Sequence, residues 1–168
     1  MRACATRGPA NLPRDRMTRL EQVASTGKAQ LYTPGLLALA IGLAEYPINP
    51  AHPHHAEVRS RVCGSVVAAS LDLDAAGRVT KFGTRVSACA VGQAAAALFA
   101  RGVVGRDAAA LLDTRQALAD WLSGGGSMPP WPGLEVLAPA LPHTGRHAAI
   151  MLPWNAALRA LSINGHAD

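Results

Sequence analysis

Two cysteines, Cys63 and Cys89, are the residues best suited to chemistry in this sequence. Cys63 comes just before a strand-like stretch and is followed by Gly64, which lets a ligand approach the backbone closely. Cys89 opens an alanine-rich stretch, and the free N–H groups at a helix start favour a thiolate. Paired thiolates suit soft-metal binding, sulfur acceptance or redox exchange. Taken singly, each also fits an inert buried cysteine, so that alternative stays open.

The segment between the two cysteines is expected to return the chain to where it started. Apolar residues alternate with polar ones over 65–74, which predicts a strand whose solvent face includes Ser70. The same alternation over 79–88 predicts a second strand after a glycine-containing turn. A strand out and a strand back form a β-hairpin, so Cys63 and Cys89 are expected at the same end of the sheet.

Helices are predicted on both sides of this hairpin. Thr33 is a suitable N-cap with Pro34 at the first helical position, and Pro47 prevents continuation. Further helices are expected after Cys89, after Asp107 and over 146–162. Trp121, Trp131 and Trp154 are expected to be core and loop anchors. The order predicts an α+β fold, a small antiparallel β-sheet with helices packed on one face.

The segment 48–60 is expected to be a flexible, solvated loop because prolines punctuate it. It carries His52, His54 and His55 near Glu57, a composition that also occurs in metal-binding tracts. The solvated loop is the simpler interpretation of these histidines.

Two arginines, Arg59 and Arg61, flank the first cysteine motif. They could lower the pKa of Cys63 or stabilise a sulfide-bearing intermediate. Solvent-exposed charge at a strand edge is the alternative.

Length and composition favour one globular domain. The 168 residues are 49% hydrophobic and 16% charged, which argues against disorder. Residues 1–16 contain four arginines and one aspartate, and are expected to be a disordered basic tail or an extension before a true start at Met17. The domain is expected over 17–168. Cys4 falls in the tail, and three cysteines are too few for a disulfide scaffold.

Several classes of function are disfavoured. The net charge of +5 comes largely from the tail, and aromatic residues are only 4%, so we do not expect nucleic-acid binding. No apolar run has the length of a membrane helix, and the N-terminus lacks the apolar stretch of a secretory signal, so a cytoplasmic protein is expected. No Ser-His-Asp set or promising carboxylate pair is apparent, which argues against an ordinary hydrolase.

Four stretches in this order resemble the NifU/IscU-type (SufU-like) family of iron–sulfur cluster assembly scaffolds. They are "LYTPGLLALA", "RSRVCGSVVAASLDLDAAGRV", "SACAVGQAAAALFA" and "RHAAIMLPWNAALRAL", and they span about residues 31–161. Cys63-Gly64-Ser65 matches the family's Cys-Gly-Asp step. "CAVGQAAAA" matches its cysteine followed by a small-residue helix.

The resemblance implies that Cys63 and Cys89 bind iron or a nascent [2Fe–2S] cluster, with zinc as an alternative. It implies sulfur delivery by a cysteine desulfurase and cluster transfer to acceptor apoproteins, which is a carrier function without catalysis. Two family ligands are missing, because Ala149 stands at the third cysteine and Ser65 at the aspartate. His147 is a candidate replacement ligand, and the alternative is a surface histidine at a helix start.

A homodimer sharing one cluster is a second way to complete the ligands, because two chains would supply four thiolates. A third is that no stable cluster forms. The chain would then be a zinc-binding or metal-free sulfur carrier that accepts a persulfide on Cys63 or Cys89, or a degenerate protein that docks on the assembly machinery.

Overall fold

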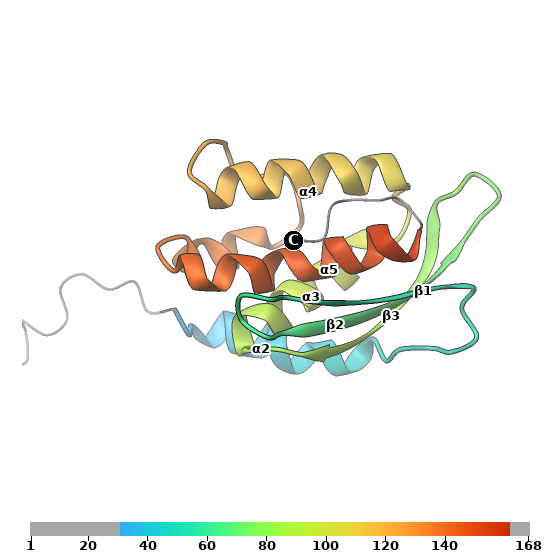
Figure 1. Ribbon diagram of the computed structural model, residues 1–168, viewed down its shortest axis with the longest axis horizontal. Helices are drawn as coiled ribbons and strands as arrows, with labels where there is room; N and C mark the ends of the chain where they lie inside the picture. The colour runs from blue at the N-terminus through green and yellow to red at the C-terminus, as the bar shows by residue number, and fades with distance from the viewer. Residues whose placement is uncertain (1–30, 162–168) are drawn as a thin grey trace, which may run out of the picture.

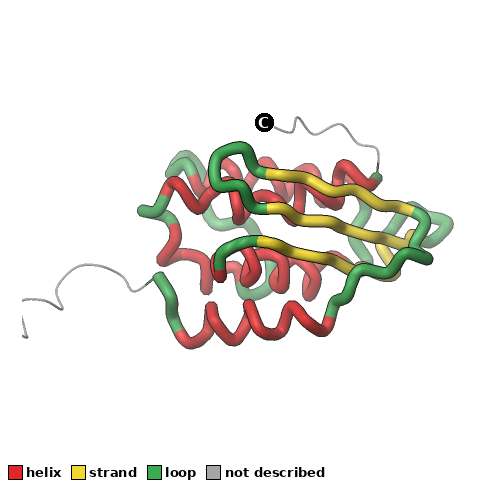
Figure 2. The backbone as a smooth tube through the Cα atoms, turned by 60° about the horizontal axis from the view of Figure 1, so that its bottom comes forward, coloured by secondary structure: helices red, strands yellow, loops and turns green. Residues whose placement is uncertain are grey.

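A three-stranded antiparallel sheet covered by helices on one face forms the frame of the molecule (Figures 1 and 2). The computed structural model describes residues 31–161, so the predictions for residues 1–16, for Cys4 and for the start at Met17 lie outside the described residues. The strands are β1 (His54–Arg59), β2 (Val66–Leu73) and β3 (Val79–Ser87), in the order β1-β2-β3. The α+β prediction is confirmed.

The helices form layers behind the sheet. Their bounds are α2 (Pro34–Gly42), α3 (Ala90–Val103), α4 (Ala108–Leu122) and α5 (His147–Ala160), with 3₁₀ turns at Leu43–Glu45, Leu134–Ala140 and Thr144–Arg146. Helix α5 packs on β1 and β2, α3 packs on β3, α2 lies along α3, and α4 lies on the outside of α5. No helix in residues 31–161 is long and apolar enough to cross a membrane.

Two of the predicted helix starts are confirmed by their caps. The hydroxyl of Thr33 accepts a hydrogen bond from the N–H of Leu36 at 3.2 Å, and Pro34 occupies the first position of α2. The Asp107 carboxylate accepts from the N–H of Ala110 at 2.9 Å and starts α4.

Small side chains let α3 approach its neighbours closely. Its alanines 94–97 are all fully buried. Phe99 is the centre of an aromatic cluster, stacked on Trp131 with ring centroids 5.6 Å apart and edge-on to Trp154 at 5.1 Å. Trp131 also donates from Nε1 to the carbonyl of Leu98 at 2.9 Å. With Trp121 also buried, the three tryptophans lie in the core, as expected.

The predicted loop at 48–60 is in part wrong, because residues 54–59 form strand β1. His54 pairs with Leu71, and Arg59 pairs with Val66. Val58 is the only buried residue of this strand, so the alternation of apolar and polar residues is too weak to reveal the strand. Backbone pairing to β2, which no side-chain pattern encodes, holds the segment in place.

The predicted solvent exposure of Ser70 is also wrong. The residues just before β1 cross the outer face of the sheet and cover it: Asn49 donates its N–H to the Ser70 hydroxyl at 3.1 Å, and His52 Nδ1 lies 3.1 Å from the same oxygen. Both His52 and Ser70 are therefore buried. Gly83 makes the crossing possible, because a Cβ there would lie 2.3 Å from the carbonyl oxygen of Pro47.

Candidate functional site

Cys63 lies in the tight turn that joins β1 to β2. The N–H of Ser60 donates to the carbonyl of Ser65 at 2.8 Å, and the N–H of Gly64 donates back to the carbonyl of Ser60 at 3.0 Å. Gly64 has a φ of 71°, in the left-handed region, and a Cβ on it would meet nothing within 4 Å. The glycine is therefore required by the backbone conformation of the turn.

Two buried serines hold the Cys63 side chain and backbone. The N–H of Cys63 donates to the Ser60 hydroxyl, and its Sγ lies in hydrogen-bond contact with the Ser65 hydroxyl, both at 3.2 Å. Burial raises the pKa of the Cys63 thiol, but the hydrogen bonds with the side chains of Ser60 and Ser65 and the backbone bonds at Ser65 and Cys63 more than offset it. The pKa of Cys63 lies below its ordinary value. Neither neighbouring arginine contributes to this shift.

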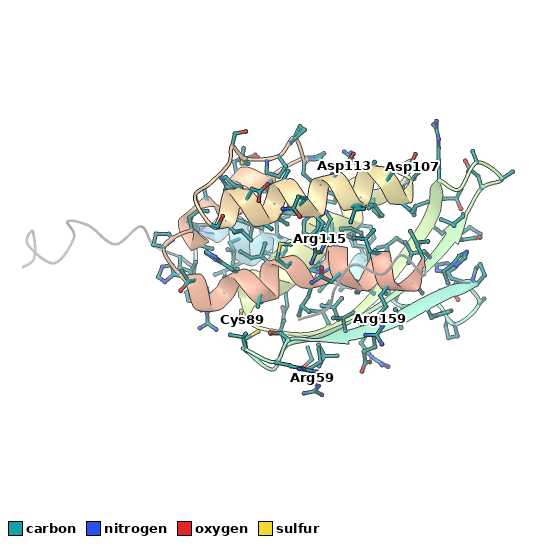
Figure 3. The ribbon with its side chains drawn as sticks, turned by 45° about the horizontal axis from the view of Figure 1, so that its top comes forward. Arg59, Cys89, Asp107, Asp113, Arg115 and Arg159 are labelled. Atoms are coloured by element: carbon teal, nitrogen blue, oxygen red, sulfur yellow. The ribbon has the colours of Figure 1, made fainter. Side chains whose placement is uncertain are left out.

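Cys89 is the N-cap residue of α3, with extended backbone geometry and no capping bond from its side chain. Its carbonyl accepts from the N–H of Gln93 at 3.0 Å, which is the first bond of the helix. Figure 3 shows Cys89 at the end of the sheet where β3 gives way to the helix. The helix start predicted at this cysteine is confirmed.

The strand register brings both cysteines to one end of the sheet. Val66 of β2 pairs with Ser87 of β3. Cys63 lies just before Val66 and Cys89 lies just after Ser87, so both cysteines are near this pair. Both thiols are free and partly exposed. The β-hairpin predicted from the alternation is therefore confirmed, and it places Cys63 and Cys89 at the same end of the sheet.

The start of α5 lies at the same end of the molecule. A Cβ added to Gly92 would lie 3.3 Å from the Cβ of Ala149, so the first turns of α3 and α5 touch at these two residues. Ala149 is fully buried. The position where the family resemblance places a third cysteine is thus beside the helix that Cys89 begins.

His147, the other residue considered for the site, is half-buried at the first position of α5. Its Nε2 lies 3.0 Å from the carbonyl oxygen of Leu141, and this contact holds the imidazole ring against the segment that leads into α5. Over residues 31–161, no three His, Cys, Asp or Glu side chains gather closely enough to hold a metal ion. The role of His147 as a metal ligand stays a prediction.

Sequence reasoning missed Ser60 as part of the site. The available signal was the pattern Ser-x-x-Cys-x-Ser over 60–65, which places a serine on each side of Cys63. A serine hydroxyl in a turn can accept a hydrogen bond from a backbone N–H a few residues away.

Taken together, a one-sided three-stranded α+β fold with two thiols at one sheet end defines a small thiol-bearing protein with a candidate site for soft ligands. No family model matches the sequence, and no curated protein matches it. Solved structures do match. The N-terminal part of a NifU-like protein from Brucella abortus has a TM-score of 0.72 and 29% identity, over 79% of this chain and 93% of that one.

A protein from Fervidobacterium islandicum, provisionally assigned as an iron–sulfur cluster assembly scaffold of the SUF system, has a TM-score of 0.66. It is 16% identical, covers 80% of this chain and 99% of its own, and shows the shared fold alone. The resemblance to the NifU/IscU-type family is confirmed by these neighbours. Scaffolds of this kind are assembly proteins rather than enzymes, in agreement with the expected non-enzymatic role.

Proposed function

We propose that this protein is an iron–sulfur cluster assembly scaffold that carries iron or a nascent [2Fe–2S] cluster on Cys63 and Cys89. Sulfur arrives from a cysteine desulfurase, and the finished cluster passes to acceptor apoproteins. The cluster is cargo, so the site has to bind and release it without catalysing a reaction. The scaffold role itself is what the NifU-like and SufU neighbours support.

The observation that carries this proposal is the Val66–Ser87 register, which places the two thiols at one end of a NifU-like fold. Thiolates are the ligands that iron–sulfur clusters prefer, and a [2Fe–2S] cluster commonly takes four. One chain supplies two thiols in its described part. A homodimer that presents two such ends to each other completes the four, and His147 with its free Nδ1 is the alternative source of a ligand.

The first experiment is anaerobic reconstitution with iron, cysteine and a cysteine desulfurase. Visible absorption and analysis of bound iron and sulfide are compared for the wild type, Cys63→Ser and Cys89→Ser. We expect a cluster spectrum in the wild type that is lost in both variants. Iron per chain distinguishes a cluster bridging two chains from one held by a single chain. A colourless wild type without iron contradicts the scaffold proposal.

A second candidate is a sulfur carrier that holds a persulfide without a cluster, either free of metal or with zinc. It is favoured by the lowered pKa of Cys63 and by the buried alanine at the third-cysteine position. A carrier stays colourless in the reconstitution and gains the mass of one sulfur on Cys63 or Cys89. A protein that only docks on the assembly machinery keeps partner binding when both cysteines are replaced by serine.

The cellular setting follows from the same proposal. The partners are a cysteine desulfurase and acceptor apoproteins, and the protein works in the cytoplasm rather than at a membrane or on nucleic acid. Fractionation of cells expressing the tagged chain tests this location.

A further inference from the structure

Helix α2 is apolar on the side that faces solvent as well as on the side that faces the core. Leu36 and Leu39 are buried in the core, where α2 lies along α3. On the opposite side, Leu37 is 43% exposed and Ile41, one turn further along, is 77% exposed. Tyr32, just before the helix, is exposed as well. Figures 1 and 2 show α2 along the lower edge of the molecule, with no described element below it.

No charged side chain interrupts this exposed face of α2. Residues 31–44 contain neither acidic nor basic residues, and the Thr33 hydroxyl is used in the helix cap. The outer helix α4, by contrast, carries Asp113, Gln116 and Asp120 on its exposed side. A helix that is apolar on all sides is normally buried. We therefore expect the outer face of α2 to be covered in solution.

The sequence just before the described part of the chain has the pattern of a partner for this face. Thr18 and Glu21 have the spacing of a capping box, which marks the start of a helix, and Gly27 is a suitable residue to end it. Between these signals, the apolar residues follow the spacing of a single helical face. They are Leu20, Val23 and Ala24.

We propose that residues 19–26 form a short helix that packs antiparallel on the exposed face of α2, with Leu20 near Ile41 and Val23 near Leu37. The lengths agree, because such a helix is about 12 Å long and α2 is about 13.5 Å long. The connection over 27–33 has a length that is usual between two packed helices. This inference goes beyond the proposed function and does not depend on it.

The short connection favours this segment over other occupants of the α2 face. A segment tethered in this way meets the face at an effective concentration on the order of millimolar. A second copy of the chain has to reach the face at the far lower concentration of the protein itself. A membrane surface fits less well, because helices that lie on membranes carry Lys or Arg on their polar side and α2 has neither.

The first test measures backbone hydrogen exchange of the full chain by mass spectrometry. An isolated helix of this length is not stable in water, so protection of its amides requires packing. In the wild type, the amides of residues 20–26 should exchange at least about tenfold more slowly than in a free peptide of the same sequence. Ile41→Asp places a charge in the contact and should remove this protection, while α3 stays protected. Gln22→Asp adds the same charge on the other side of the segment and should preserve it.

Three outcomes of the exchange measurement overturn the inference. The first is that residues 20–26 exchange as fast in the wild type as in the free peptide. The second is that their protection survives Ile41→Asp. The third is that their protection increases with protein concentration, because a second copy would then cover the face instead.

A disulfide test locates the contact within one chain. The three natural cysteines are first replaced by serine, and circular dichroism confirms that each variant is folded. Val23→Cys with Leu37→Cys should then form an intramolecular disulfide with oxidised glutathione. Gln22→Cys with Leu37→Cys is the control and should form it at least about tenfold more slowly. Equal rates for the two pairs, or a disulfide-linked dimer in place of the closed monomer, contradict the proposed packing.

Discussion

At the scale of single residues, the chemistry of Cys63 is set by two serines. Ser60 and Ser65 are both buried, so their hydroxyls are held beside the cysteine rather than in bulk water. A hydroxyl both donates and accepts, so Ser65 can donate to the sulfur once the thiol has lost its proton. A serine at this position stabilises a thiolate, whereas an aspartate would add a negative charge next to it.

Ser65→Ala is therefore expected to raise the pKa of Cys63 and to slow its alkylation several-fold at neutral pH. The measurement is the rate of iodoacetamide labelling of Cys63 as a function of pH, in a Cys89→Ser background. In the parent, labelling should reach half its maximum below the ordinary thiol pKa of 9.0. Ser65→Thr keeps the hydroxyl and serves as the control. Identical profiles for the alanine and threonine variants would contradict this account.

The lowered pKa of Cys63 also makes the stability of the protein depend on pH. Because the pKa of Cys63 is lower in the folded chain, the fold favours the thiolate. This contribution is complete above the pKa of the unfolded thiol and is lost as the pH falls through the pKa of the folded one. Urea unfolding of the Cys89→Ser protein should thus gain stability on raising the pH towards 9, and Ser65→Ala should gain less.

At the scale of elements, the contact between the starts of α3 and α5 positions Cys89. Gly92 has no room for a side chain, because a Cβ there would lie 2.8 Å from the Cβ of Ala88 and 3.3 Å from that of Ala149. The glycine lets the two helices approach within backbone contact. The direction in which Cys89 enters the helix therefore depends on this pair of small residues.

Gly92→Val is expected to destabilise the protein by about 1–3 kcal/mol, because the added methyl groups overlap the neighbouring alanines. Urea unfolding measures this loss. Gly145→Ala is the matched control, since a Cβ at Gly145 meets nothing within 4 Å, and its effect should stay within about 0.5 kcal/mol. Equal stability of the two variants would refute the proposed close contact.

At the scale of the whole molecule, the ligand set is incomplete within one described chain. The sheet end brings Cys63, Cys89 and the start of α5 together, and Ala149 of α5 is buried there. The family resemblance implies a third cysteine at this alanine, so the proposed site has two thiols in one chain instead of three.

Ala149→Cys should accordingly strengthen metal retention. We expect iron bound after reconstitution to be lost more slowly to a chelator than from the wild type, because a third thiolate is added. Ala148→Cys, one position earlier on α5, is the control for simply adding a cysteine. The thermal midpoint is measured alongside, since a larger group at a buried site costs stability. Equal iron loss from the two variants would show that position 149 does not face the site.

Much of the fold was predictable because its signals are local. The N-caps at Thr33 and Asp107, the alternation in β2 and β3, and the small-residue helix after Cys89 are properties of neighbouring residues. Because the two strands of the hairpin have similar lengths, the chain returns to the end of the sheet from which it left, and both cysteines lie there. The family resemblance supplied the expected role of the site, which the structural neighbours support at the level of a scaffold.

What only the tertiary structure decided depends on contacts between segments distant in sequence. The sequence of β1 resembles a loop because the place of this strand comes from backbone bonds to β2. The alternation alone predicts Ser70 in solvent, whereas the segment with Asn49 and His52, which lies outside that strand, covers it. The lowered pKa of Cys63 likewise needs the geometry of its turn. Local patterns fix which elements form, whereas burial and hydrogen bonding of particular side chains depend on which elements meet.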